Sequence, residues 1–248
     1  MLLRRLPEGA LAIAQPAHAW LAGRLAAAWA PWPRALAGLA DELAMAAGIH
    51  DLAWGERDAA PVLDPSTSLP QRFVDVPVED HVALWERATG LARPFGPLPA
   101  LLVSQHGTRL LRGRAAEGGE RVATYLAREE AVQRALREEL ARSPVHAGLD
   151  VARAGALIAA WDALSLHACH GPGREILVAD VPWHEGSCAL RVAPAQAGAV
   201  RVVPWPFAPP RVRLAVPGRP VAPACGQTEL EDAWRAAELT WLELALVP

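Results

Sequence analysis

Apolar residues in the first two-thirds of the chain recur at helical spacing, and proline and glycine interrupt them. Pro16 suits the first position of a helix, and Gly171-Pro172-Gly173 is a stop signal for another. The pattern predicts six helices. They cover residues 17–29, 34–50, 78–91, a segment after Pro97-Leu98-Pro99 that carries His106, residues 120–142 and residues 149–169. An irregular loop rich in aspartate and proline is expected over residues 56–77.

After Gly173 the pattern changes to short apolar runs with partial alternation, which is typical of half-buried strands. The predicted strands cover residues 176–179, 189–192, 200–203, 212–215 and 240–247, with a helix over residues 229–238. We therefore predict a mainly α fold. A helical domain over residues 1–172 carries the candidate site, and a C-terminal antiparallel β subdomain over residues 173–248 packs on it.

The composition narrows the functional classes. All 24 basic residues are arginine, so the chain has neither a P-loop lysine nor a Schiff-base lysine. A net charge of -3 with dispersed arginines gives no electrostatic footprint for nucleic acid. The abundance of alanine, proline and glycine indicates a GC-rich, bacterial genome. We expect a small-molecule substrate and no nucleic-acid partner.

Cysteine usage and hydropathy predict a cytoplasmic protein. The three cysteines form no Cys-x-x-Cys pair and are odd in number, which fits a reduced compartment. Residues 1–5 resemble the basic start of a signal peptide, but Glu8 and Gln15 break up the apolar run that such a peptide requires. No stretch reaches the roughly eighteen uncharged apolar residues of a membrane span.

Candidate chemistry lies in four residues on three predicted helices: His18, the dipeptide His50-Asp51, and Asp162. Imidazole and carboxylate are ligands for divalent cations, and a helical core can gather them from separate helices. Asp162 interrupts an apolar run, where an unpaired carboxylate would be costly. We predict that these four residues bind a divalent metal ion: Mn, Fe, Mg, Ni or Zn. In the alternative, His50-Asp51 only ends a helix and Asp162 hydrogen-bonds His18 or a tryptophan indole without a metal.

Further residues are candidates for catalysis around such an ion. His106 would be another ligand or a donor to phosphate, and Arg109 or Arg112 would neutralise substrate charge. Glu56 and Asp58 follow the His-Asp dipeptide closely and would act as general acid or base.

The order of the four ligands resembles that of the HD-domain superfamily of metal-dependent phosphohydrolases, and His50-Asp51 is the dipeptide that names the group. The resemblance implies an HD-like helical bundle and hydrolysis of a small phosphorylated metabolite or nucleotide. The chain departs from many relatives at Ala17 and Leu52, where acidic residues are expected, and in having no lysine after the dipeptide.

Over nearly its whole length the chain is also similar to an uncharacterised bacterial family, DUF3891, which implies no activity. This likeness rests on six separated segments. They are residues 15–22, 50–54, 101–111, 161–166, 205–207 and 218–220.

Two other functions stay open beside the phosphohydrolase. One is a non-catalytic helical module that binds a small molecule or a partner. The other is an HD-type di-iron oxygenase, for which His106 and His81 are candidate additional ligands.

Overall fold

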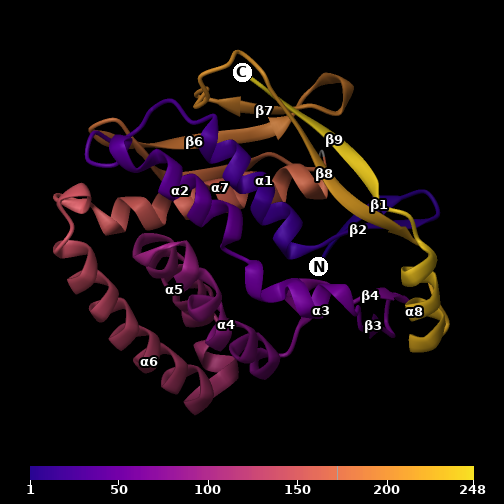
Figure 1. Cartoon of the computed structure of the whole chain (residues 1–248). Coiled ribbons are helices and arrows are strands. Elements are labelled where there is room, and N and C mark those ends of the chain that lie inside the picture. Colours follow the sequence, from indigo (N-terminus) through magenta and orange to yellow (C-terminus); the bar gives the residue numbers. More distant parts are fainter. Residues whose placement is uncertain (172) are drawn as a thin grey trace.

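The computed structural model describes residues 1–171 and 173–248, and Pro172 lies outside the described residues. Helices account for most of the described chain up to residue 171, and one further helix, α8, lies in the C-terminal part (Figure 1). They are α1 (Gln15–Ala27), α2 (Ala40–Ile49), α3 (Gly55–Ala59), α4 (Val78–Ala92), α5 (Pro97–Arg112), α6 (Ala115–Ala141), α7 (Val151–His170) and α8 (Gln227–Ala236). The strands are β1 (Leu2–Leu6), β2 (Gly9–Ile13), β3 (Leu63–Asp64), β4 (Leu69–Pro70), β5 (Ile176–Trp183), β6 (Gly186–Pro194), β7 (Val200–Val203), β8 (Val212–Val221) and β9 (Thr240–Val247).

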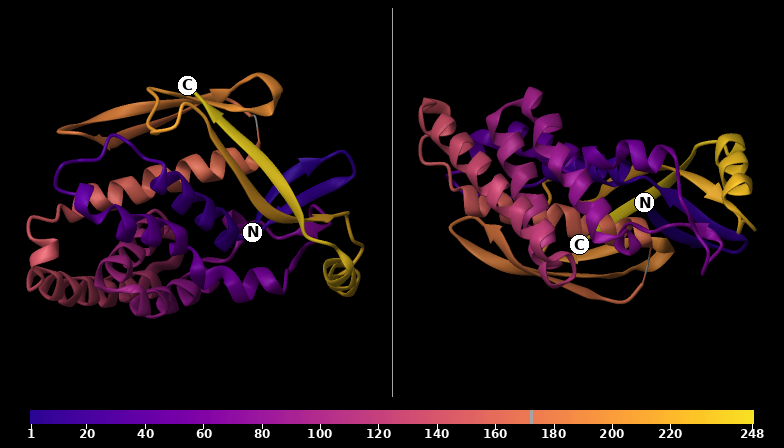
Figure 2. Two further views of the ribbon diagram at one scale, coloured as in Figure 1. Left: turned by 45° about the horizontal axis from the view of Figure 1, so that its top comes forward. Right: turned by 90° about the horizontal axis from the view of Figure 1, so that it is seen from below.

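Seven strands form one curled sheet in the order β1-β2-β8-β9-β7-β6-β5. Neighbouring strands are antiparallel except β7 and β9, which are parallel, so the sheet is mixed. The sheet lies over α1, α2 and α7, and helices α4, α5 and α6 lie beyond them (Figures 1 and 2). Strands β3 and β4 form a separate hairpin.

The predicted fold class is wrong. The chain is not a mainly α, HD-like bundle with a small C-terminal antiparallel subdomain, because a seven-stranded mixed sheet spans one side of the molecule. Its first two strands come from the N-terminus: β2 pairs with β8, Ala10 opposite Val221. The two-domain division at residue 172 stays a prediction, and the boundary residue lies outside the described part of the chain.

Strands β1 and β2 are missing from the sequence prediction because neither alternates apolar and polar residues: β1 reads Leu-Leu-Arg-Arg-Leu and β2 reads Gly-Ala-Leu-Ala-Ile. Strand β2 begins at Gly9, whose φ of +133° L side chains rarely adopt. A Cβ on Gly9 would also lie 2.1 Å from the carbonyl oxygen of Val221. Leu2, Leu11 and Ile13 are buried in a cluster that seals α1 and α7 against this end of the sheet.

Most helix predictions are confirmed. The segments at 78–91 and 149–169 correspond to α4 and α7, and the last strand has the predicted bounds. Helix α2 starts later than predicted, after a short 3-10 turn at Ala37–Leu39. The segment 56–77, predicted to be irregular, holds most of α3 and the β3/β4 hairpin.

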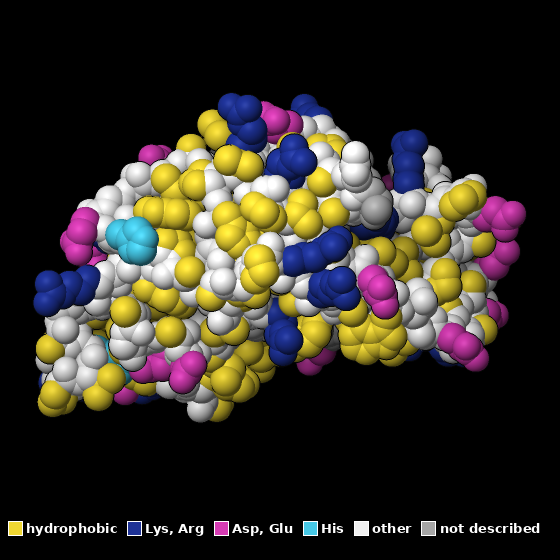
Figure 3. Space-filling view, turned by 90° about the horizontal axis from the view of Figure 1, so that it is seen from above, with side chains coloured by type: hydrophobic (Ala, Val, Ile, Leu, Met, Phe, Trp, Pro, Cys, Tyr) yellow, Lys and Arg dark blue, Asp and Glu magenta, His cyan; other side chains and the backbone are white. Residues whose placement is uncertain are grey.

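Alternation along the central strands decides which face of the sheet meets the helices. In β7, Val200 and Val202 are buried while Arg201 is exposed, and Arg213 next to buried Val212 repeats the pattern in β8. Figure 3 shows arginine, acidic and apolar side chains interspersed on the upper surface of the molecule. No helix of the described residues is long and apolar enough to cross a membrane.

Helix α5 is central to the helical layer, because it contacts α2, α4, α6 and α7. The large core includes Trp29, which follows α1, and Trp161 in α7, whose rings meet edge to face at 5.7 Å. Side chains that point inward from α1, α2, α5 and α7 therefore converge beside this core. This convergence positions the candidate site.

The close contact of α1 with α2 depends on Gly23. A Cβ there would lie 2.9 Å from both the carbonyl oxygen of Ala44 and the Cα of Gly48, which are backbone atoms that cannot rotate away. We expect Gly23→Ala to lower the free energy of unfolding by roughly 1–3 kcal/mol through overpacking. Gly90→Ala, at a helical position with nothing within 4 Å, should instead raise it by up to about 1 kcal/mol. Urea unfolding of both variants checks this, and equal stability of Gly23→Ala and wild type would contradict it.

Candidate metal centre

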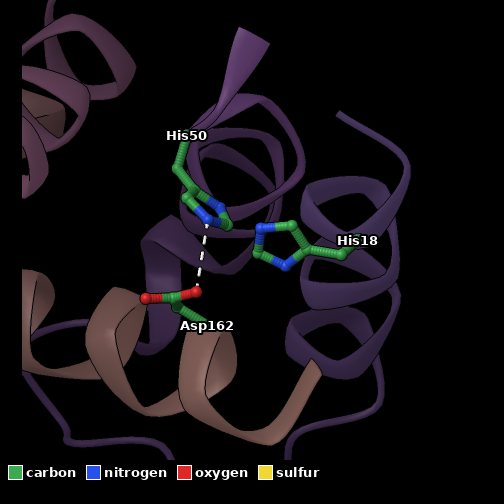
Figure 4. A group of neighbouring side chains, drawn as sticks. All are labelled: His18, His50 and Asp162. Carbon is green, nitrogen blue, oxygen red and sulfur yellow. Dashed lines mark ion pairs between the residues drawn. The ribbon is translucent and has the colours of Figure 1, made fainter. Parts of the chain in front are cut away.

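The four predicted ligands lie together in the interior. His18 comes from the first turns of α1, His50 and Asp51 follow the end of α2, and Asp162 lies in the middle of α7. All four residues are buried, His18 and His50 completely. Figure 4 shows the two imidazole rings and the carboxylate of Asp162 pointing toward one another. Residues separated by more than a hundred positions in the sequence therefore form one polar cluster.

The spacing of the polar atoms suits a single ion. The Nε2 atom of His18 lies 2.8 Å from Oδ2 of Asp51, and Nε2 of His50 lies 3.6 Å from Oδ2 of Asp51 and from Oδ1 of Asp162. Metal–ligand bonds of about 2.1 Å at right angles place neighbouring ligand atoms about 3 Å apart. His18, His50 and Asp162 each offer one ligand atom, and these three atoms lie within 4.8 Å of one another. The same holds for one ligand atom each from His50, Asp51 and His106.

Protein acceptors orient both imidazoles through their Nδ1 atoms. Nδ1 of His50 donates to the carbonyl oxygen of Ala47 at 2.7 Å, and its buried Nε2 has no hydrogen-bond partner among the described residues. Nδ1 of His18 lies 2.9 Å from Oγ of Ser165, whose hydroxyl donates to the carbonyl oxygen of Asp162. In metal centres, ligand histidines are typically anchored in this way through the ring nitrogen that does not bind the ion.

Without an ion, the cluster is held together by protons and charge. Burial alone lowers the pKa of His50, but the carboxylates of Asp51 and Asp162 outweigh it and raise that pKa to about 9. Burial alone raises the pKa of both carboxyl groups. The contact with His50 at 3.6 Å and the charges of the nearby imidazoles outweigh it and lower the pKa of Asp162, as the charge of His50 does for Asp51. The negative charge of the two carboxylates is therefore balanced by protonated imidazole in the metal-free cluster, and a metal ion would take over that role.

His106 and Arg109 join the cluster from α5. Nε2 of His106 lies 4.0 Å from Oδ1 of Asp51 and from Oδ2 of Asp162. Arg109 donates to Nδ1 of His106 at 3.2 Å and to Oδ2 of Asp162 at 3.5 Å. Because arginine cannot accept a hydrogen bond, this contact places the imidazole proton on Nε2. Burial and then the charge of His50 lower the pKa of His106 to about 3, so this ring is neutral.

The structure does not bring Glu56 and Asp58 into the cluster. Glu56 is on the surface of α3 and forms an ion pair with Arg87 at 2.6 Å. Asp58 is buried, but its carboxylate lies 3.2 Å from the ammonium group of Met1 and accepts the backbone N–H of Gln15 at 2.6 Å. Asp58 thus anchors the start of α1 to the first strand. Arg112 forms an ion pair with Glu130 at 3.0 Å.

A cavity of about 410 Å³ opens beside the cluster. His18, Asp51, His106 and Asp162 form part of its wall, so the centre is accessible to a small molecule. The rest of the wall is mostly apolar and includes Trp54. Such a combination of an apolar wall with a few convergent polar groups is typical of small-molecule sites.

The model of DUF3891, described as a protein of unknown function, matches residues 1–222. The chain belongs to the DUF3891 family. No curated protein and no solved structure matches the chain. The match to DUF3891 covers every residue of the cluster and ends before α8 and β9.

The sequence reasoning missed two contributors to this DUF3891 site, Ser165 and Gln15, and it named His81 only as an additional ligand for a di-iron centre. Ser165 supports His18, and Gln15 and His81 line the cavity. Ser165 had a detectable signal, because it lies three positions after Asp162 and so shares its helix face. No local pattern in the sequence places Gln15 and His81 at the same cavity, because the packing of α1 and α4 brings them there.

Ser165 gives a direct test of how the centre is supported. We expect Ser165→Ala to lower metal affinity about 10–100-fold, because His18 loses the acceptor that fixes its ring. Ser104→Ala is the matched control, since this equally buried serine bonds Glu129, outside the cluster. The control should lose stability but keep wild-type metal affinity in a competition titration. Equal affinities in both variants and wild type would show that Ser165 does not support the centre.

Proposed function

We propose that this DUF3891 protein is a metal-dependent hydrolase of a small phosphorylated metabolite or nucleotide. The observation that carries the proposal is the buried set of His18, His50, Asp51 and Asp162, with polar atoms at the spacing of neighbouring metal ligands. The unpartnered Nε2 of His50 supports it, because a buried nitrogen without a hydrogen-bond partner is costly unless something binds it. The cavity beside the set supports a small substrate.

A divalent ion at this position would lower the pKa of a bound water and polarise a phosphoryl oxygen. The neutral His106 then donates its Nε2–H to an oxygen of the substrate, and Arg109 holds the ring in that orientation. Arg109 also offers positive charge at the edge of the cluster for a phosphoryl group. Water supplies the oxygen that bonds to phosphorus, the phosphorus–oxygen bond to the leaving group breaks, and that group takes up a proton.

The ligand order is a second support. His18, His50-Asp51 and Asp162 follow one another along the chain as the ligands do in HD-domain phosphohydrolases, and all come from helices or helix ends. We propose a distant relationship on these four positions alone, without the helical-bundle fold. We also propose a reducing, cytoplasmic setting, which the free cysteines Cys169, Cys188 and Cys225 support.

The di-iron oxygenase is the weaker candidate. The two groups of potential ligands overlap at His50, whose Nδ1 is already bonded to Ala47. One remaining nitrogen cannot serve two ions, so the groups describe alternative positions for one ion. His81 belongs to neither group.

The test begins with the metal content of protein purified without chelators. It continues with phosphate release from nucleoside monophosphates and p-nitrophenol release from bis-p-nitrophenyl phosphate. We expect about one equivalent of a divalent metal, and hydrolysis that disappears on chelation and returns on reloading. Bound metal without hydrolysis of any phosphoester would favour the non-catalytic binding module, and iron with oxygen-dependent turnover would favour the oxygenase. Protein that neither contains nor binds a metal would refute the proposal.

A further inference from the structure

Two residues that line the metal-centre cavity each carry a buried polar atom without a hydrogen-bond partner among the described residues: Nε2 of His81 and Oε1 of Gln15. Both residues are more than nine-tenths buried, at 6% and 2% exposure. Unpartnered buried polar groups are costly, and in a cavity they mark positions where a ligand completes the hydrogen bonding. Neither residue belongs to the groups that would hold the ion.

The surroundings of His81 determine which proton it carries. Arg114 donates to Nδ1 of His81 at 3.1 Å and to the carbonyl oxygen of Val76 at 2.9 Å, and it forms an ion pair with Glu117 at 2.6 Å. Arginine has no acceptor, so Nδ1 of His81 is unprotonated and the proton is on Nε2. The unpartnered atom of His81 is therefore a hydrogen-bond donor.

Aromatic side chains hold the His81 ring in place. Its centroid lies 5.1 Å from the ring of Trp54 and 6.2 Å from that of Trp85. Burial and then the charge of Arg114 lower the pKa of His81 to about 4, so the ring stays neutral at physiological pH. A neutral imidazole beside an arginine is a poor cation ligand, and it is well suited to bind an uncharged oxygen.

Gln15 presents the complementary group at the start of α1. Its amide oxygen is a hydrogen-bond acceptor, and its backbone N–H is taken by Asp58. Trp54, Phe73 and Leu166 supply apolar wall of the same cavity. Arg114, a cationic residue of this wall, is neutralised by Glu117, so this part of the cavity offers little to a polyanion.

We propose that His81 and Gln15 are substrate-binding residues that recognise an uncharged body carrying an amide or hydroxyl group. Nε2–H of His81 donates to an oxygen of that body, and Oε1 of Gln15 accepts from its N–H or O–H. The inference rests on the proposed function and narrows its substrate class to phosphoesters of compact, largely apolar molecules with one neutral polar group.

The test measures binding of two non-hydrolysable probes, phenylphosphonate and 4-acetamidophenylphosphonate, to the metal-loaded protein by calorimetry. The acetamido group carries both a carbonyl oxygen and an N–H. We expect wild type to bind the acetamido probe about tenfold more tightly or better, because the acetamido group can form hydrogen bonds with both Nε2 of His81 and Oε1 of Gln15. The preference should largely disappear in His81→Phe and Gln15→Leu, and His81→Gln, which keeps an N–H donor, should restore part of it.

The controls separate recognition from folding and from metal binding. Each variant should keep wild-type metal content and a cooperative thermal transition, and His146→Gln, a histidine paired with Glu42 away from the cavity, should keep the full preference. Equal affinity of wild type for both probes, or an unchanged preference in His81→Phe and Gln15→Leu, would overturn this inference alone. Metal-loaded wild type that binds neither phosphonate would overturn the phosphoester proposal together with it.

Discussion

Asp162→Asn is expected to lower metal affinity at least 100-fold, because even the loss of a residue that only orients a ligand costs about 10–100-fold. The substitution keeps the shape of the side chain and removes the charge that faces Nε2 of His50 at 3.6 Å. A 100-fold drop in affinity removes about 2.7 kcal/mol of stabilisation under conditions that saturate wild type. The melting temperature of wild type should therefore fall on chelation, and that of Asp162→Asn should no longer respond.

The metal-free proteins are expected to differ as well. Removing one partner of a buried ion pair costs about 3–5 kcal/mol, because it leaves the other charge uncompensated. Asp232→Asn is the matched control, since this exposed carboxylate of α8 pairs with Arg235 far from the cluster in the sequence and should keep metal and chelator response. A wild type indifferent to chelation, beside an Asp162→Asn variant destabilised equally with and without chelator, would end the metal hypothesis. It would leave a hydrogen-bonded polar core without an ion.

The stability of the metal-free protein and its metal affinity should depend on pH with opposite signs. The folded-state pKa of His50, about 9, lies above the ordinary value of 6.5. Protonated His50 therefore stabilises the metal-free fold fully below pH 6.5, and this contribution disappears as the pH rises to 9. The difference between the two pKa values corresponds to a contribution on the order of 3 kcal/mol to the free energy of unfolding.

Metal binding should show the reverse trend, because the ion must displace the proton from His50. We expect affinity to rise about tenfold for each pH unit between pH 7 and 9, with one proton released per ion. Urea unfolding of chelated protein across this range, and calorimetry in two buffers of different ionisation enthalpy, measure the two effects. His146→Gln should follow wild type in both. Chelated protein of constant stability from pH 6.5 to 9 would show that His50 does not carry the proton.

Arg109 connects the two roles proposed for α5, which are to present His106 to the substrate and to place positive charge beside Asp162. The same guanidinium orients His106 and faces Asp162, so the residue that fixes the neutral ring would also border the proposed ion. The residues predicted as acid or base from proximity in sequence, Glu56 and Asp58, lie outside the cluster, on the surface and beneath the N-terminus. Neighbours along the chain were a poor guide here, because the helix that follows His50-Asp51 turns away from the centre.

The sequence by itself determined the helices and the candidate ligands. Helical periodicity and proline or glycine boundaries are local signals, so α4, α7 and β9 were found near their true bounds. The clustered candidate ligands could be selected because buried carboxylates and imidazoles are chemically conspicuous, and Asp162 interrupts an otherwise apolar helix face.

The tertiary structure alone decided the sheet and the cavity. Two five-residue strands at the N-terminus carry too little local pattern, and only pairing of β2 with β8 makes them part of a seven-stranded sheet. Likewise, His81 and Gln15 share a cavity because α4 and α1 pack around the turn at Trp54, and nothing in their own segments indicates it. Strand pairing and cavity walls depend on contacts between distant segments, and a hydrophobic pattern read along one chain does not contain them.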